Sequence, residues 1–182
     1  MGWSITDGDI YVDGVNGNDI SGDGTINNPY ASIQKSFDSM PAATPTTVFK
    51  IIVAGGVYEE ILFWNAEVTL SGITDYIFTL EGDGVVVLDG KSVDPERNST
   101  GFKGSQSSAA SGNNSFTVKN FQIQNFGVLW DSGSAAAPSN GWKAYNCHFI
   151  GDPTSLISYD IRSYYTIFRF CTFRKLRYYA HS

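Results

Sequence analysis

The chain carries little charge and few cysteines, and it lacks the segments that mark membrane or exported proteins. Only 16% of its 182 residues are charged. Two cysteines, Cys147 and Cys171, are too few for a disulfide scaffold, and their spacing of 24 residues fits no common zinc pattern. No window approaches the roughly 20 apolar residues of a membrane helix. The N-terminus has neither the basic nor the apolar region of a classical signal peptide. We therefore expect no membrane association and no disulfide framework.

The composition is typical of a folded β protein. Hydrophobic residues make up 42% of the chain and aromatic residues 14%, and 19 glycines accompany the low charge. Such a glycine content favours short strands joined by many turns over long helices. A length of 182 residues suits one domain with a hydrophobic core. We therefore predict a single all-β domain over residues 1–182.

The charge is divided unevenly along the chain. Residues 1–100 hold 15 acids and 4 bases, a net of −11, whereas residues 101–182 hold 3 acids and 8 bases, a net of +5. Basic and aromatic residues near the C-terminus form a predicted interface: Arg169, Arg174, Lys175, Arg177, Tyr178 and Tyr179. The expected partner is an acidic neighbour, including the acidic half of another copy, and the alternative is a solvated rim. A pI near 4.7 disfavours nucleic acid as a partner.

The N-terminal segment predicts a strand, a long loop and a short helix. Residues 9–13 alternate between apolar and polar, and residues 13–28 are dense in Gly, Asn and Asp. Ile33, Phe37 and Met40 then recur at i, i+4 and i+7, with Ser32 as the N-cap and Pro41 as the stop. An amphipathic helix here is suited to cover the exposed end of a strand stack.

Short apolar runs follow the helix, and we predict strands over 48–53, 57–63, 68–70, 77–80 and 85–88. The C-terminal half contains a repeat: Lys-Asn-Phe-Gln-Ile from residue 119, Tyr-Asn-Cys-His-Phe from residue 145 and Arg-Phe-Cys-Thr-Phe from residue 169. The second residues of these units lie 26 and 24 positions apart (146 − 120 and 170 − 146). A period near 25 indicates a solenoid of stacked coils.

The repeat also predicts which side chains stack. Because strand side chains alternate between faces, two inward rows are expected, one of Phe121, Cys147 and Cys171 and one of Ile123, Phe149 and Phe173. Asn120 and Asn146 are expected to hydrogen-bond along the stack, and Phe170 breaks that ladder. Residues 99–115 and 131–141, rich in Gly, Ser, Ala and Asn, are interpreted as loops.

Two segments resemble the opening of the right-handed parallel β-helix superfamily, which includes pectate-lyase-like enzymes and phage tailspikes. The first is residues 11–38, with Pro-Tyr-x-x-Ile-Gln from residue 29, and the second is residues 50–58, Lys-Ile-Ile-Val-Ala-Gly-Gly-Val-Tyr. Residues 77–90 resemble a strand, bend and strand of one coil in that superfamily. The resemblance implies an all-β right-handed parallel β-helix with an N-terminal capping helix. In that division, residues 1–47 form the strand, loop and cap, and residues 48–182 form the coils.

No catalytic residue, metal ligand or cofactor is predicted. A glycosidase requires two carboxylates across a groove, and no spacing selects a pair among Glu59, Glu60, Asp89, Asp131, Asp152 and Asp160. Residues 19–30 begin like a calcium loop but place Tyr30 where a bidentate Glu belongs. His148 is expected to face outward and His181 to lie in the chain terminus, and the four tryptophans are core or interface candidates.

Two function hypotheses remain. The first is a non-enzymatic structural protein of a phage or virus particle, a tail spike or fibre segment or a capsid-decorating subunit, located in the virion. Its partners would be other virion proteins and further copies of the chain, a trimer by resemblance, with a host glycan as a further candidate. The alternative is a fragment of a polysaccharide lyase, glycoside hydrolase or glycan-binding β-helix protein, with a cytoplasmic or extracellular location.

Overall fold

The computed structural model describes residues 8–40, 48–65, 77–105, 115–131, 142–152, 161–162 and 166–176. The elements are β1 (Gly8–Val12), α1 (Ile33–Asp38), β2 (Val48–Tyr58), β3 (Leu62–Asn65), β4 (Ile77–Asp89), β5 (Thr100–Ser105), β6 (Ser115–Gln124), β7 (Val128–Asp131), β8 (Trp142–Tyr145), β9 (His148–Ile150), β10 (Ile161–Arg162), β11 (Ile167–Arg169) and β12 (Thr172–Arg174). The described part of the chain is therefore all-β apart from one short helix. No helix within it is long and apolar enough to cross a membrane.

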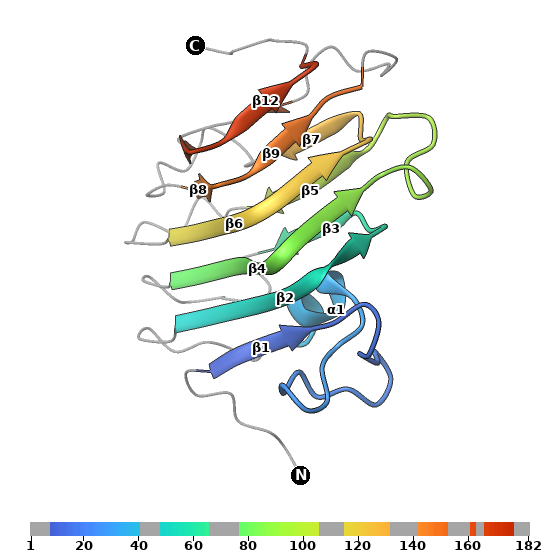
Figure 1. Ribbon diagram of the computed structural model, residues 1–182, viewed down its shortest axis with the longest axis vertical. Helices are drawn as coiled ribbons and strands as arrows, with labels where there is room; N and C mark the ends of the chain where they lie inside the picture. Colours follow the sequence, from blue (N-terminus) through green and yellow to red (C-terminus); the bar gives the residue numbers. More distant parts are fainter. Residues whose placement is uncertain are drawn as a thin grey trace.

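The strands form two sheets in which every pairing between described strands is parallel. One sheet has the order β1-β2-β4-β6-β8-β11, with β9 paired to β6 and β12 paired to β9, and the other has the order β10-β7-β5-β3. From β2 onward the chain visits the two sheets alternately, and each visit adds the next strand beside the previous one (Figure 1). This stacking of successive passages is a solenoid-like arrangement.

The strand register confirms the predicted repeat. Lys119 pairs with Tyr145, and Tyr145 pairs with Arg169. In the same way Ile123 pairs with Phe149, and Phe149 pairs with Phe173. The spacings of 26 and 24 residues read from the sequence are therefore the lengths of two successive turns of the chain.

The core lies between the two sheets, and aromatic rings fill its middle. Phe116 of β6 stacks on Trp64 of β3 at 4.7 Å between ring centroids and on Phe102 of β5 at 5.3 Å. Trp142 of β8 lies 4.5 Å from Phe116 and meets Trp130 of β7 edge to face at 5.3 Å. Aromatic pairs in such geometry add stability beyond the apolar area that they bury. These contacts tie successive turns of the chain to one another.

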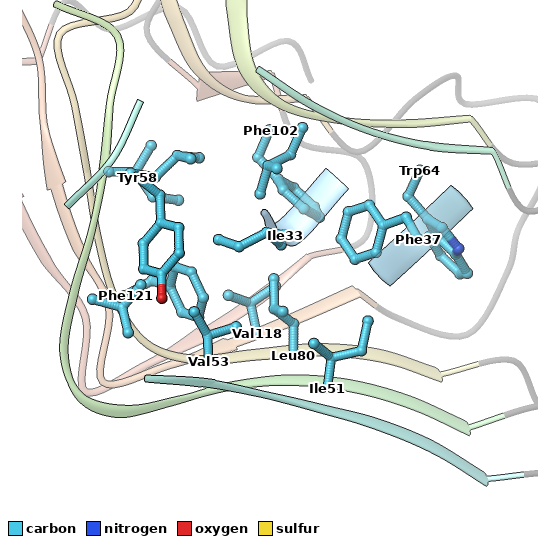
Figure 2. Packing of buried hydrophobic residues seen from close by; sticks show 14 of the residues in the cluster. Ile33, Phe37, Ile51, Val53, Tyr58, Trp64, Leu80, Phe102, Val118 and Phe121 are labelled. Carbon is cyan, nitrogen blue, oxygen red and sulfur yellow. The ribbon is translucent and has the colours of Figure 1, made fainter. Parts of the chain in front are cut away.

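The helix α1 closes the core at the β1 end, as predicted. Its N-cap is Ser32, whose hydroxyl accepts the Lys35 backbone N–H at 3.2 Å. Ile33 and Phe37 are buried and point into the space between the sheets (Figure 2). Phe37 meets Phe102 edge to face at 6.4 Å. The helix therefore covers the apolar cross-section that the first strands would otherwise expose.

The predicted asparagine ladder is confirmed. The Asn146 side-chain amide donates to the Asn120 side-chain oxygen at 3.0 Å, and the Asn120 amide donates to the Gly82 carbonyl at 3.1 Å. Asn120, Asn146 and Phe170 all have positive φ, at 62°, 51° and 56°. Asparagine tolerates this left-handed conformation, whereas a bulky side chain there is an outlier. Phe170 thus ends the ladder at a strained position.

Two predictions about strands and loops are wrong in detail. Residues 77–80 and 85–88 do not form two strands, because β4 runs through both with a register shift between Glu81 and Val86. Residues 100–105, interpreted as loop, form β5. A Cβ at Gly104 would lie 1.9 Å from the Trp142 ring, and one at Gly101 would lie 2.4 Å from the Phe126 ring. These glycines make room for aromatic side chains in a strand, and their presence imitates a loop composition.

The predicted strand over 57–63 is divided between the end of β2 and β3. The predicted strand 68–70 and the helix stop Pro41 lie outside the described residues, as does most of the predicted loop 131–141.

Candidate functional site

The last described turn of the chain is exposed where the turn before it is buried. In β8 and β9 the inward residues are fully or almost fully buried, including Trp142, Ala144 and Phe149. Residues 166–176, which we call the open end, contain no buried residue. No described strand pairs with the outer edge of β11 or β12. The open end therefore combines an unpaired strand edge with a partly uncovered core row.

Aromatic side chains form the apolar part of the open end. Phe173 stacks on Phe149 at 5.2 Å with nearly parallel rings, and Phe168 meets both of them edge to face. Phe173 is nevertheless 37% exposed, and no row of described residues covers it. Phe170 is 84% exposed. The open end therefore exposes Phe170 and part of Phe173 to solvent.

The predicted basic residues of the open end are Arg169, Arg174 and Lys175, and all three are exposed. Arg169 pairs in register with Tyr145 and Arg174 with Ile150, so both arginines lie on the outer face of the larger sheet. No acid occurs within residues 166–176. These three residues of the predicted interface are therefore accessible to solvent. Arg177, Tyr178 and Tyr179 lie outside the described residues.

The two cysteines lie on neighbouring turns and are both free. The Thr172 backbone N–H donates to the Cys147 carbonyl at 2.9 Å, which fixes the two strands side by side. A hydrogen bond between the thiols, together with burial, raises the pKa of Cys147, and the same hydrogen bond lowers the pKa of Cys171. Cys147 is buried and Cys171 is half-buried. Cys171 is therefore the more reactive thiol.

His148 is exposed on the outer face, as predicted, and its Nδ1 contacts the Thr172 hydroxyl of the next turn. Cys147 is buried on the other side of the strand. The two side chains therefore do not form a nucleophile and base. His181 lies outside the described residues.

The candidate carboxylates Glu60 and Asp89 accept hydrogen bonds from distant parts of the chain. Glu60 accepts the backbone N–H groups of Ile33 and Gln34, both at 2.9 Å, at the start of α1. Burial raises the pKa of Glu60, and these two hydrogen bonds oppose the shift. Asp89 accepts hydrogen bonds from Gln124 and Asn125 at 2.8 and 2.7 Å. Burial opposes ionisation of Asp89, but hydrogen bonds outweigh it and lower its pKa.

The other candidate acids are also dispersed. Asp152 forms an ion pair with Arg97 at 3.0 Å, Asp131 is buried at the end of β7, and Glu59 is exposed beside β2. Asp160 lies outside the described residues. Within the described ranges, no group of three or more His, Cys, Asp or Glu is placed to hold a metal ion.

Sequence reasoning missed one buried acid. Asp94 is 2% exposed and accepts backbone N–H groups from Asn98, Ser99 and Gly127 at 2.9 to 3.1 Å. It fastens the turn before β5 to the start of β7. The Asp-Pro pair at 94–95 is a turn signal that marks this position.

The three tryptophans of the described residues belong to the core. Trp64, Trp130 and Trp142 are buried in the aromatic core, and Trp3 lies outside the described residues. These three tryptophans fill the space between the sheets, so of the two roles expected from the sequence, core and interface, they have the core role.

Comparison of the chain with protein-family models, with curated proteins and with solved structures gives no match. Among the described residues, the feature that geometry sets apart is the open end.

Proposed function

We propose that this protein is a non-enzymatic structural component of a phage or virus particle that acts through protein–protein contacts at its open end. We further propose that its coils follow the right-handed parallel β-helix that the sequence resembles. The second proposal is supported by the alternation of the chain between two parallel sheets. It is also supported by the strong preference of parallel strand connections for the right-handed path.

The observation that carries the functional proposal is the contrast between the two ends of the strand stack. At the β1 end, α1 covers the core with Ile33 and Phe37. At the other end, the inward row of Phe168 and Phe173 is partly exposed, and no described strand pairs with the outer edge of β11 or β12. An exposed edge flanked by aromatic and arginine side chains has the composition of protein interfaces. A role as a contact surface for another protein explains why the edge of β11 and β12 is exposed.

The placement in a virus particle is proposed on two grounds: the resemblance to tailspikes, and the dispersal of the described candidate acids, which bond to other parts of the fold. Glu60 and Asp89, two of the acids weighed for a glycosidase, accept hydrogen bonds from the start of α1 and from the Asn125 side chain. The trimer expected from the resemblance would need lateral contacts between coils. The contact that the described surface supports best is made by the end of the stack.

The test is a protein inventory combined with site-specific cross-linking. Particles purified from the natural source are analysed by mass spectrometry, and the proposal predicts that the chain is a regular component of them. A photoreactive phenylalanine analogue at position 170 is then expected to form a light-dependent adduct with a structural protein of the same particle. The same analogue at Phe63, a partly exposed position on β3, serves as the control. Absence of the chain from the particles, or equal labelling from both positions, would contradict the proposal.

A second candidate function is binding or cleavage of an acidic glycan on the outer face of the larger sheet. Tyr145 lies there between Lys119 and Arg169 in one column of paired residues. An aromatic ring flanked by bases suits a sugar that carries carboxylates. The test is titration with acidic polysaccharides, with release of sugar ends measured in parallel. Binding that is lost in Tyr145→Ala and retained in Val15→Ser would favour this candidate.

A further inference from the structure

The end of the molecule opposite the open end also exposes apolar side chains. Residues 13–30, which we call the head loop, join β1 to the segment before α1, and they lie at the far end of the strand stack from β12 (Figure 1). Val15, Ile20 and Ile26 of the head loop are 85%, 98% and 67% exposed. Each of these three side chains is therefore mostly exposed and contributes little to the packing of the loop.

The head loop leaves little of β1 open to another strand. The Tyr11 backbone N–H donates to the Gly24 carbonyl at 2.8 Å, and the Tyr11 carbonyl accepts the Tyr30 N–H at 3.1 Å. The Asp13 N–H donates to the Tyr30 carbonyl at 2.8 Å. A partner at this end therefore meets side chains of a well-bonded loop and not a free strand edge from Tyr11 onward.

The two ends carry opposite charge. The head loop contains Asp13, Asp19 and Asp23 and no base, whereas the open end contains three bases and no acid. Hydrogen bonds from Asn16 lower the pKa of Asp13, and those from Thr25 lower the pKa of Asp23. The head loop is therefore negative at neutral pH. Opposite charges around apolar groups steer and orient protein contacts.

We propose that the open end of one copy docks on the head loop of a second copy, so that copies of this chain assemble head to tail. The inference rests on the proposed function and deepens it, because it names the partner of the open end. Phe170 and Phe173 of one copy meet Val15, Ile20 and Ile26 of the next. Arg169, Arg174 and Lys175 surround that contact opposite the three aspartates.

A second copy joined tail to tail fits less well. Such a contact would set three bases against the same three bases, and like charges at an interface are unfavourable. The head-to-tail contact uses a different surface on each copy. Because these surfaces lie at opposite ends of the strand stack, each added copy presents a new open end, and the assembly grows as a line.

The first experiment is sedimentation velocity of the full chain over a range of protein concentrations. We expect species larger than a dimer that grow with concentration. Sodium chloride raised from about 0.1 M to about 1 M shortens the Debye length from about 10 Å to about 3 Å and should weaken assembly. A monomer at every concentration overturns the inference.

Two variants break one end each. The tail variant Arg169→Glu/Arg174→Glu/Lys175→Glu and the head variant Val15→Lys/Ile20→Lys change exposed side chains only. Each is expected to weaken self-association by more than about tenfold, which corresponds to about 1.4 kcal/mol. The matched control Val57→Lys/Val85→Lys replaces exposed valines on β2 and β4 and should assemble normally. Circular dichroism of each variant verifies that it is folded.

Mixing the two variants distinguishes the head-to-tail contact from other contacts between copies. A tail variant keeps an intact head loop, and a head variant keeps an intact open end, so an equimolar mixture should form dimers and nothing larger. Dimers formed by the head variant alone would show a tail-to-tail contact and overturn the inference. A monomeric wild type together with a position-170 adduct to another particle protein would overturn the inference and leave the proposed function standing. A monomeric wild type that also forms no position-170 adduct with a particle protein would overturn both the inference and the proposed function.

Discussion

Two neighbouring residues of β9, His148 and Phe149, face opposite sides of the sheet and test the strand register. Phe149 is fully buried and contacts the rings of Trp130, Phe168 and Phe173 at centroid distances of 5.9, 5.6 and 5.2 Å. His148 is exposed, and its described partner is the Thr172 hydroxyl. Truncation of each side chain to alanine should therefore have very different effects.

The size of each effect can be worked from these contacts. Phenylalanine truncated in a core typically destabilises by 3–5 kcal/mol, and because Phe168 and Phe173 are partly exposed and free to relax, we expect about 3 kcal/mol for Phe149→Ala. His148→Ala should change the free energy of unfolding by less than about 0.5 kcal/mol. Phe149→Asp places a charge in the core and should prevent folding.

The assay is equilibrium unfolding in urea, followed by circular dichroism and tryptophan fluorescence. The midpoint should fall for Phe149→Ala with little change of slope, and it should stay close to that of the wild type for His148→Ala. If His148→Ala is the more damaging of the two, the register of β9 is shifted by one residue and every inward row is assigned to the wrong face.

Three further perturbations test other parts of the structure. Asn146→Ala removes a ladder hydrogen bond and leaves a non-glycine residue at positive φ, so the free energy of unfolding should fall by about 1–2 kcal/mol. Phe170→Asn should extend the ladder and raise the urea midpoint. An unchanged midpoint in both variants would contradict the ladder. Gly104→Ala drives a Cβ into the Trp142 ring and should destabilise by about 1–3 kcal/mol; part of this loss should return in Gly104→Ala/Trp142→Phe, whereas strictly additive effects would show that the two positions do not touch. Alkylation of Cys171 should follow its lowered pKa: it should be slow at low pH, where the thiol is protonated, and fast above a midpoint lower than the usual value of about 8.5. Cys147 should react only on unfolding. Peptide mass spectrometry after labelling at each pH measures both thiols, and equal labelling of the two would show that the assignment is wrong.

The sequence allowed the cap and the repeat to be predicted because both depend on local patterns. Ser32, Ile33 and Phe37 define the helix through capping and spacing alone. The repeat around Asn120 and Asn146 depends on a strict side-chain alternation and on a residue type that accepts positive φ. These signals can be identified in one sequence because the helix signal and each unit of the repeat consist of a few neighbouring residues.

The errors come from residues whose role is set by distant contacts. Gly101 and Gly104 imitate a loop, yet they belong to β5 because Phe126 and Trp142 occupy the space of their side chains. The continuity of β4 through Gly82-Asp83-Gly84 was hidden in the same way by glycines that are typical of turns. Phe126 and Trp142 are distant in sequence from the glycines of β5 that they contact, so composition alone favoured a loop there.

At the candidate site, sequence predicted the bases but not the form of the surface. Arg169, Arg174 and Lys175 were identified from charge clustering, and the structure exposes all three. Phe173 was assigned correctly to an inward row, but its partial exposure depends on the absence of a covering row among the described residues. The acids Glu60 and Asp94 hold backbone far away in the chain, and no spacing rule predicts such partners.

The most direct test of the central claim, that the open end of one copy contacts the head loop of another, is hydrogen–deuterium exchange compared between dilute and concentrated protein. The account predicts that concentration slows exchange in residues 166–176 and 13–30 and leaves residues 48–58 of β2 unchanged. No change at either end, or protection confined to the outer face of the larger sheet, would contradict it.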